Sequence, residues 1–312
     1  MNYFLKTIII HSFFLFLSVI PINAYGNTKT SEPPLQIVAT DSIIADWIKN
    51  ISNNSFHLTT LVGPDTDNHT FEPSPQDSVA LSKANLIFEN GLGLEFWLNG
   101  LYKSSESKAS RIALSSHIKN LLKANCHGPH CNHGQDYDPH TWLDVTNAIT
   151  MVQIITDTLI NKNPQNAQTY QTLSEKYIAE LKSLDDWIFQ QVSQIPLNNR
   201  KLITNHNSFA YFAKRYGFTI LGDILGSTTT EHVDPSAAHF KDLVKIIRKN
   251  KVPAIFGENI HNNALVNKLA NETHLPQPKL LYTEALSKED GPAKNYIELM
   301  KYNVKTLVEN LK

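Results

Sequence analysis

Residues 164–194 read PQNAQTYQTLSEKYIAELKSLDDWIFQQVSQ and decide the architecture of the chain. No glycine interrupts this stretch and its only proline stands at the first position, so it predicts one continuous amphipathic helix. At 1.5 Å per residue, about 28 helical residues span about 42 Å, which is long enough to connect two lobes. A long helix inside one domain is the alternative. The apolar residues recur in steps of three and four at Tyr170, Leu173, Tyr177, Leu181, Leu184, Ile188 and Val192.

On both sides of this helix, short apolar runs alternate with helical patterns, which is typical of parallel α/β sheets. Strands are expected at 35–39, 56–62, 86–88 and 112–114 before the helix, and at 201–204, 218–221, 254–256 and 279–282 after it. We therefore predict an α/β fold with two lobes and parallel-type sheets. The N-terminal lobe covers 35–162, the linker helix 163–195 and the C-terminal lobe 196–312.

Length, composition and charge exclude several classes of protein. The chain has 312 residues, of which 41% are hydrophobic and 18% charged; this excludes extended disorder and favours two domains. Lys and Arg number 28 against 29 Asp and Glu, so no basic field is available for nucleic acid, and no nucleic-acid partner is expected. Two cysteines cannot form a multi-cysteine zinc or iron–sulfur site, whereas 13 histidines offer imidazole as a metal ligand.

The N-terminus has the pattern of a cleaved signal peptide over residues 1–26, followed by a disordered lead-in over 27–34. Lys6 supplies the positive charge, and the apolar run from Thr7 to Ile22 is shorter than the roughly 20 residues that span a bilayer. No cysteine stands near the cleavage region, so we expect a periplasmic monomer without a stable membrane anchor.

Four polar residues stand at the ends of predicted elements. His69, His206 and Glu284 each follow a predicted strand, and His140 lies in a loop before a predicted helix. Ligands bind beyond the carboxyl ends of strands in open α/β sheets, so these residues can converge in the cleft between the lobes, two from each. Three imidazoles and one carboxylate complete a tetrahedral zinc site without a position for reactive water, which favours holding the metal over catalysis. The alternative is that each histidine is an ordinary surface or core residue.

Five ordered motifs extend this interpretation: DNHTFEPSP (67–75), NGLGLE (90–95), DPHTWLD (138–144), HNSFAYF (206–212) with Tyr216-Gly217, and YTEAL (282–286). The resemblance that they carry covers nearly all of the chain from Leu35 to Lys312. The chain resembles the zinc and manganese substrate-binding proteins of bacterial ABC importers, the ZnuA-type family. The resemblance implies two lobes, a rigid linking helix, delivery of the ion to an inner-membrane ABC permease, and His69, His140, His206 and Glu284 as ligands. Members with a carboxylate at the last position usually carry Asp there, one methylene shorter than Glu.

The third ligand bears on the choice between zinc and manganese. The resemblance implies that manganese members of the family have a site of two histidines and two carboxylates, with an acid at the position that corresponds to His206. Imidazole suits zinc and hard oxygen ligands suit manganese, so the sequence favours Zn²⁺ as the transported ligand, with Mn²⁺ as the alternative.

Residues 126–134, CHGPHCNHG, precede the His140 motif. The resemblance implies a short low-affinity zinc loop at His127, His130 and His133. In an oxidising compartment a disulfide between Cys126 and Cys131 is the preferred interpretation, and a thiolate zinc site is the alternative.

Other candidates have simpler explanations. The group at 231–234 with His239 is explained by a helix start with solvated histidines. Glu258, at the end of a predicted strand, is a candidate partner or gate beside the site. Glu72 and Asp144 could accept from ligand rings, although Asp144 could also cap the following helix. Trp142 and Phe71 are expected to pack beside the site.

An enzyme is the rival class, in the form of a periplasmic zinc hydrolase. Such an enzyme needs three protein ligands, an open position and a general base, but the sequence contains no H-E-x-x-H, G-x-S-x-G or P-loop motif. We therefore expect no catalytic residues. A surface interaction protein, the third class, would have no buried metal site.

Overall fold

The long helix is present in the computed structural model as α5, Ala167–Val192, after a single 3₁₀ turn at Pro164–Asn166. The structure describes residues 34–53, 55–124, 136–228, 230 and 235–312. The predicted apolar face of α5 is buried except for Leu173, which is half-buried. Ser174 takes part in the buried face instead, because its hydroxyl accepts a 2.8 Å hydrogen bond from Thr156 on the neighbouring helix.

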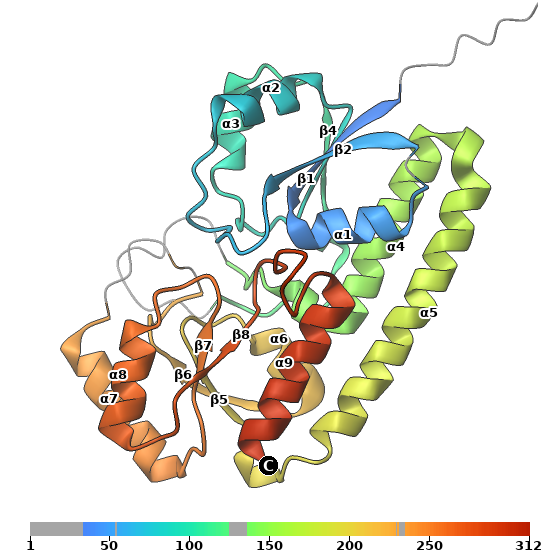
Figure 1. The fold of residues 1–312 in the computed structure, drawn as a ribbon. Helices are drawn as coiled ribbons and strands as arrows, with labels where there is room; N and C mark the ends of the chain where they lie inside the picture. Colours follow the sequence, from blue (N-terminus) through green and yellow to red (C-terminus); the bar gives the residue numbers. More distant parts are fainter. Residues whose placement is uncertain (1–33, 54, 125–135, 229, 231–234) are drawn as a thin grey trace, which may run out of the picture. The chain divides into compact units, whose positions relative to one another are not determined.

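The N-terminal lobe is built on a parallel sheet of four strands in the order β2-β1-β3-β4 (Figure 1). Its strands are β1 (Leu35–Asp41), β2 (Phe56–Val62), β3 (Leu86–Glu89) and β4 (Ser110–Ala113), and its helices are α1 (Ser42–Asn50), α2 (Pro75–Lys83), α3 (Leu98–Ser104) and α4 (Val145–Lys162). The last strand begins two residues before the predicted 112–114 run. The predicted start of α2 is confirmed, with Ser74 and Asp77 forming a capping box.

Successive residues of this sheet point to opposite faces, as the strand period requires. On β1, Ile37 and Ala39 belong to the large core that includes α1 and α4, whereas Val38 belongs to a smaller cluster with α2 and α3. Both faces of the sheet are therefore covered by helices, which explains its continuous apolar strands.

The C-terminal lobe pairs β5 (Lys201–Thr204) with β6 (Thr219–Asp223) and β7 (Phe256–Glu258) with β8 (Lys279–Leu281), both in parallel. Its helices are α6 (Ala210–Tyr216), α7 (Ala237–Asn250), α8 (Ala264–Thr273) and α9 (Tyr296–Leu311). The helix predicted after residues 231–234 is present as α7, but Ser236 is its N-cap and its first residue is Ala237. The prediction of two α/β lobes with parallel sheets is confirmed.

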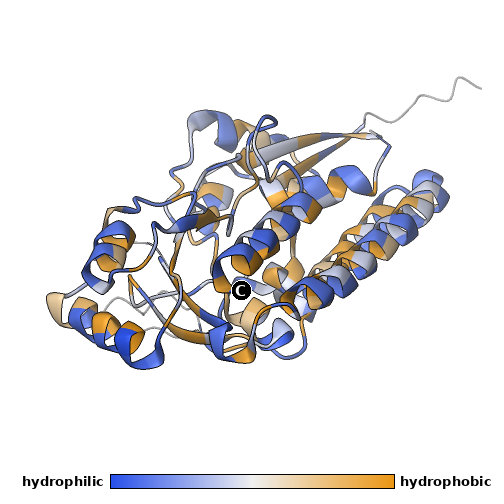
Figure 2. Cartoon of the chain, turned by 60° about the horizontal axis from the view of Figure 1, so that its bottom comes forward, coloured by the Kyte–Doolittle hydropathy of each residue, from blue (hydrophilic) through white to orange (hydrophobic). Residues whose placement is uncertain are grey.

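One hydrophobic core continues from the first lobe through α5 to the second. Leu181 and Ile188 of α5 share this core with Ile37 of β1 and Leu202 of β5. Hydrophobic residues gather along one side of the long helices, opposite hydrophilic ones (Figure 2). The helix is therefore part of the packing of both lobes. Among the described helices, none combines the length and hydropathy that a membrane crossing requires.

Candidate metal centre

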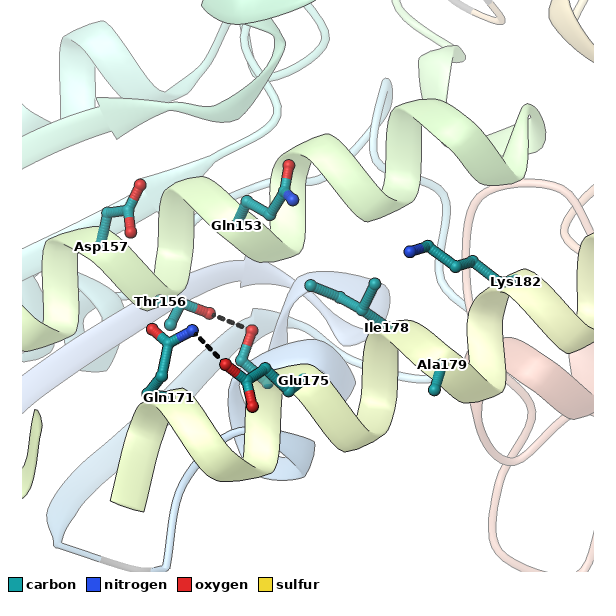
Figure 3. Close-up of a pocket in the computed structure, with 9 residues that line it drawn as sticks. Gln153, Thr156, Asp157, Gln171, Glu175, Ile178, Ala179 and Lys182 are labelled. Atoms are coloured by element: carbon teal, nitrogen blue, oxygen red, sulfur yellow. Dashed lines mark hydrogen bonds between the residues drawn. The ribbon is translucent and has the colours of Figure 1, made fainter. Parts of the chain in front are cut away.

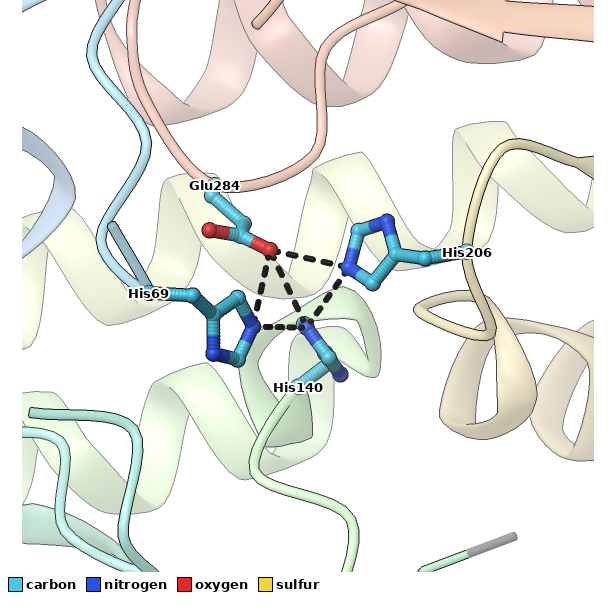
Figure 4. A group of neighbouring side chains, drawn as sticks. All are labelled: His69, His140, His206 and Glu284. Atoms are coloured by element: carbon cyan, nitrogen blue, oxygen red, sulfur yellow. Dashed lines mark hydrogen bonds and ion pairs between the residues drawn. The ribbon is translucent and has the colours of Figure 1, made fainter. Parts of the chain in front are cut away.

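The structure brings together the four residues that the sequence singled out (Figure 4). His69 lies beyond β2, His206 two residues beyond β5, and Glu284 beyond β8, while His140 directly precedes the 3₁₀ turn Thr141–Leu143 that leads into α4. Their exposed fractions are 1% for His69 and 0% for the other three. Four side chains from both lobes thus meet in a closed, buried group.

The ligand atoms have the spacing of a tetrahedral ion site. Glu284 Oε1 lies 3.1 Å from His69 Nε2, 3.3 Å from His140 Nε2 and 2.9 Å from His206 Nε2. His140 Nε2 lies 3.4 Å from His69 Nε2 and 3.1 Å from His206 Nε2. Ligands bound at about 2.0–2.1 Å around a tetrahedral zinc ion lie about 3.3–3.4 Å from one another. The observed separations fit that geometry.

Two of the histidines are positioned by the same local turn, Asp-x-His. Asp67 Oδ1 accepts a 2.8 Å hydrogen bond from the His69 backbone N–H, and Asp138 Oδ1 accepts one of 2.9 Å from the His140 N–H. Aspartate favours such turns because its short carboxylate bonds to the backbone two residues on. The sequence analysis missed both aspartates, although the repeated Asp-x-His spacing was visible.

Two of the three imidazoles are also fixed through the nitrogen that faces away from the centre. His140 Nδ1 lies 2.7 Å from Asp138 Oδ1, and His206 Nδ1 lies 2.8 Å from Glu258 Oε2. Such carboxylates hold a ligand ring in the tautomer that leaves Nε2 free for metal. His69 Nδ1 is buried and has no hydrogen-bond partner among the described residues.

Glu284 presents one oxygen to the imidazoles. The Asn68 backbone N–H donates to Glu284 Oε2 at 3.3 Å, and the Asn68 side-chain amide donates to the Glu284 carbonyl at 3.2 Å. Oε1 alone makes the three short approaches to the histidines (Figure 4). The carboxylate is therefore held for binding through a single oxygen.

The buried charges set the protonation of the centre. Burial would raise the pKa of Glu284, but His69, His140 and His206 outweigh burial and hold that pKa well below its usual range. Burial would lower the pKa of His140, but the Asp138 carboxylate, together with Glu284, raises it. Burial would likewise lower the pKa of His206, but the Glu258 carboxylate, together with Glu284, raises it well above its ordinary value. Without metal, protons on these imidazoles balance the buried carboxylates.

The loop NGLGLE supports the segment that carries His140. Glu95 accepts hydrogen bonds from the backbone N–H groups of Asn90 at 2.7 Å and Gly91 at 3.1 Å, which closes the loop. Gly91 has φ +87°, a conformation that glycine adopts without strain. The Asn90 amide then donates to the Pro139 carbonyl at 3.0 Å, one residue before His140. This motif therefore has a positioning role.

The structure decides the minor candidates in different ways. Glu258 contacts His206, as expected for a partner of the site. The expectation that Glu72 accepts from a ligand ring was wrong, because Glu72 is exposed. For Asp144 the alternative is confirmed, since it caps α4 by accepting from the Thr146 N–H, and Asp138 contacts His140 instead.

The remaining candidates pack or lie elsewhere. Trp142 is buried with its ring 5.3 Å from that of His140, and Phe71 packs 4.9 Å from Trp97. His239 is half-buried on α7 and its Nε2 lies 2.8 Å from the Asp223 carbonyl. The predicted zinc loop and disulfide (Cys126, His127, His130, Cys131, His133) and residues 231–234 lie outside the described residues.

A surface groove between α4 and α5 is a different kind of hollow (Figure 3). It encloses about 440 Å³ and is lined by polar residues that include Asp157, Glu175 and Lys182, with no histidine among its lining residues. The Thr156 hydroxyl donates to Ser174 at its floor, as part of ordinary helix packing. The groove therefore offers no comparable metal ligands.

A two-lobe α/β fold with this closed group defines a class of proteins that hold and hand over a ligand. The chain matches the family described as ZnuA, zinc-uptake complex component A, periplasmic, over residues 37–310. It is 32% identical over 287 residues to the manganese-binding lipoprotein MntA of Halalkalibacterium halodurans, covering 91% of this chain and 92% of that one. It is 30% identical over 306 residues to the manganese ABC transporter substrate-binding lipoprotein PsaA of Streptococcus anginosus, covering 95% and 96%.

A solved structure has the same fold. The periplasmic zinc-binding protein TroA of Treponema pallidum superposes with a TM-score of 0.79 at 27% identity, covering 90% of this chain and 99% of that one. The chain belongs to the ZnuA family, the metal-binding components of bacterial ABC importers. It is an extracytoplasmic substrate-binding protein that works with a permease, and it is not an enzyme.

Proposed function

We propose that the protein captures Zn²⁺ through His69, His140, His206 and Glu284 and delivers it to an inner-membrane ABC permease. The observation that carries this proposal is the buried, near-tetrahedral spacing of three Nε2 atoms and one carboxylate oxygen. Four ligands leave no position for a reactive water, which is suited to carrying an ion.

The donor set supports zinc over manganese. Three of the four ligands are imidazoles, which suit zinc, whereas manganese prefers oxygen ligands in octahedral arrangements. Glu284 turns Oε1 toward the imidazoles, while Oε2 accepts a hydrogen bond from the Asn68 backbone N–H, which supports binding through one oxygen. The ligand count is therefore four, the number preferred at zinc sites.

Manganese is the second candidate. MntA and PsaA are named as manganese proteins, whereas TroA is named as a zinc protein. Zinc binds more tightly than manganese at most nitrogen and oxygen sites, so affinity in vitro does not by itself identify the transported ion.

The deciding experiment combines metal exchange with growth. We expect the purified protein to retain one tightly bound zinc, and a deletion strain to fail under zinc limitation and to grow under manganese limitation. His206→Glu should shift the preference toward manganese, and His57→Gln, at an exposed histidine of β2, should not. Growth failure only under manganese limitation would assign manganese instead.

The setting of the protein is part of the proposal. We infer that the protein is a periplasmic monomer, exported by the signal peptide predicted over residues 1–26. The relatives MntA and PsaA are named lipoproteins, so fractionation with mass spectrometry of the mature protein is the test. Partition into detergent with an attached lipid would contradict it.

Two further expectations belong to the same proposal. His127, His130 and His133 collect zinc weakly while Cys126 and Cys131 form a disulfide. The lobes meet the linker at 162/163 and 195/196, boundaries that limited proteolysis can examine.

A further inference from the structure

Behind the metal centre, a second group of ligand atoms shares one of its histidines. His206 directs Nε2 toward Glu284 and Nδ1 toward Glu258. On that outer side lies His261, three residues beyond Glu258. The three atoms His206 Nδ1, Glu258 Oε2 and His261 Nε2 lie close enough together to hold one metal ion.

The spacing of this group is that of three metal ligands. Glu258 Oε2 lies 2.8 Å from His206 Nδ1 and 3.6 Å from His261 Nε2, and the two nitrogens are 3.4 Å apart. Ligands on a tetrahedral zinc ion lie about 3.3–3.4 Å from one another, so the two distances from His261 are close to that spacing, and the hydrogen-bonded 2.8 Å contact must lengthen when an ion replaces its proton. At 3.4 and 3.6 Å the contacts of His261 are long for hydrogen bonds, so hydrogen bonding alone does not explain its position.

The surroundings hold these groups in place. The buried Glu258 accepts from the His206 backbone N–H at 3.0 Å and from the Thr283 hydroxyl at 2.9 Å. The Asn263 side chain fixes the turn that carries His261, because it donates to the carbonyls of Glu258 at 2.9 Å and His261 at 3.0 Å. The carboxylate and the turn are therefore preorganised.

This outer group lies nearer to solvent than the centre. The side chain of His261 is 10% exposed and that of Asp67 beside it is 11%, whereas the four inner side chains are at most 1% exposed. Asp67 Oδ2 lies 3.8 Å from His261 Nδ1. Negative charge next to the exposed edge favours a cation there.

We propose that His261, Glu258 and His206 Nδ1 form an outer zinc position through which the ion enters and leaves the inner centre. At this position zinc displaces the proton that His206 Nδ1 shares with Glu258, and that proton is released to water. When the ion passes to Nε2 of the same ring, Nδ1 takes up a proton again and restores its hydrogen bond to Glu258. One imidazole thus belongs to both steps. The inference rests on the proposed zinc function of the inner centre.

The first test measures residual binding in the full chain, with His127, His130 and His133 changed to Ser so that the loop does not contribute. His69→Ala with His140→Ala removes two inner ligands and should leave one weaker zinc equivalent in a chelator titration. Adding His261→Gln should weaken that equivalent by more than about tenfold, since loss of even an outer partner of a metal site costs about 10–100-fold. Adding the control His57→Gln should not change it.

The second test measures exchange with the inner centre intact. His261→Gln should slow zinc release to a chelator by about tenfold or more, because it removes a ligand of the position through which the ion leaves. If His261→Gln changes neither the residual zinc affinity nor the rate of zinc release, or leaves either one as in its parent chain, the proposed outer zinc position is refuted. Failure of the wild type to bind zinc tightly would instead refute the proposed function. If the double-alanine chain unfolds, the release rate of the single variant decides.

Discussion

Acidification should release zinc from the inner centre steeply. Zinc binds only neutral imidazole, so every proton on His69, His140 or His206 competes with it. The pKa values of His140 and His206 are raised by Asp138 and Glu258, in each case with Glu284, against the lowering effect of burial. His140 and His206 therefore bind a second proton at a higher pH than an ordinary histidine, whose pKa is about 6.5. Their affinity for zinc should consequently fall as the pH drops through neutrality.

The magnitude follows from the number of ligands. Each imidazole that must lose its proton to bind zinc contributes up to about one decade of affinity per pH unit below its pKa, so His140 and His206 together give about two. Between pH 7 and pH 5 the apparent dissociation constant should thus rise by up to about four decades. Glu284, whose pKa is held well below its usual range by the imidazoles despite burial, stays ionised over this interval and adds nothing to the slope.

Competition with a chelator of known pH dependence measures this slope. His206→Glu should reduce it by about one decade per unit, because one titrating imidazole is removed. The exposed variant His57→Gln is the control and should keep the slope of the wild type. An affinity independent of pH, or a slope below about one decade per unit, would refute the three-histidine centre.

Three further predictions address single parts of the molecule. His140→Ala should weaken zinc binding by orders of magnitude in isothermal titration while circular dichroism shows an intact apo fold; wild-type affinity or an unfolded chain would contradict this. Deletion of residues 127–133 should remove weak zinc equivalents and keep the tight one, and loss of the tight site would refute that division of labour. Leu181→Ala, at a fully buried position of α5, should lower the free energy of unfolding by about 2–5 kcal/mol in urea denaturation, and the exposed Lys182→Ala should not; equal effects would argue against a shared core.

Local patterns predicted the fold well. The apolar spacing in 164–194 placed the long helix within a few residues of α5, because helix periodicity depends only on neighbours in the sequence. The three-residue difference at its start comes from the 3₁₀ turn at Pro164–Asn166. The burial of Ser174 could not be predicted, since it depends on a hydroxyl partner, Thr156, supplied by another helix.

The four residues of the candidate centre were predictable because strand ends place polar side chains at a common edge and, above all, because the motifs around them resemble those of a known family. The carboxylates behind the rings were harder to assign. Asp138 and Asp144 both stand near His140 in the sequence, so either could have been its carboxylate partner. In the structure Asp138 contacts the His140 ring and Asp144 caps α4. His261 carried no motif, and only the folding of the turn after β7 brings it to 3.4 Å from His206.

The wide separation of the ligands along the chain has a consequence for where the ion is loaded. His69, His140 and His206 are 71 and 66 residues apart, and Glu284 lies 144 residues beyond His140, so only the folded lobes bring the four ligand atoms together. A chain whose lobes have not yet folded therefore lacks this four-ligand centre. The compartment in which the lobes fold thus determines which pool of metal the protein samples, and the captured ion in turn stabilises the folded chain there.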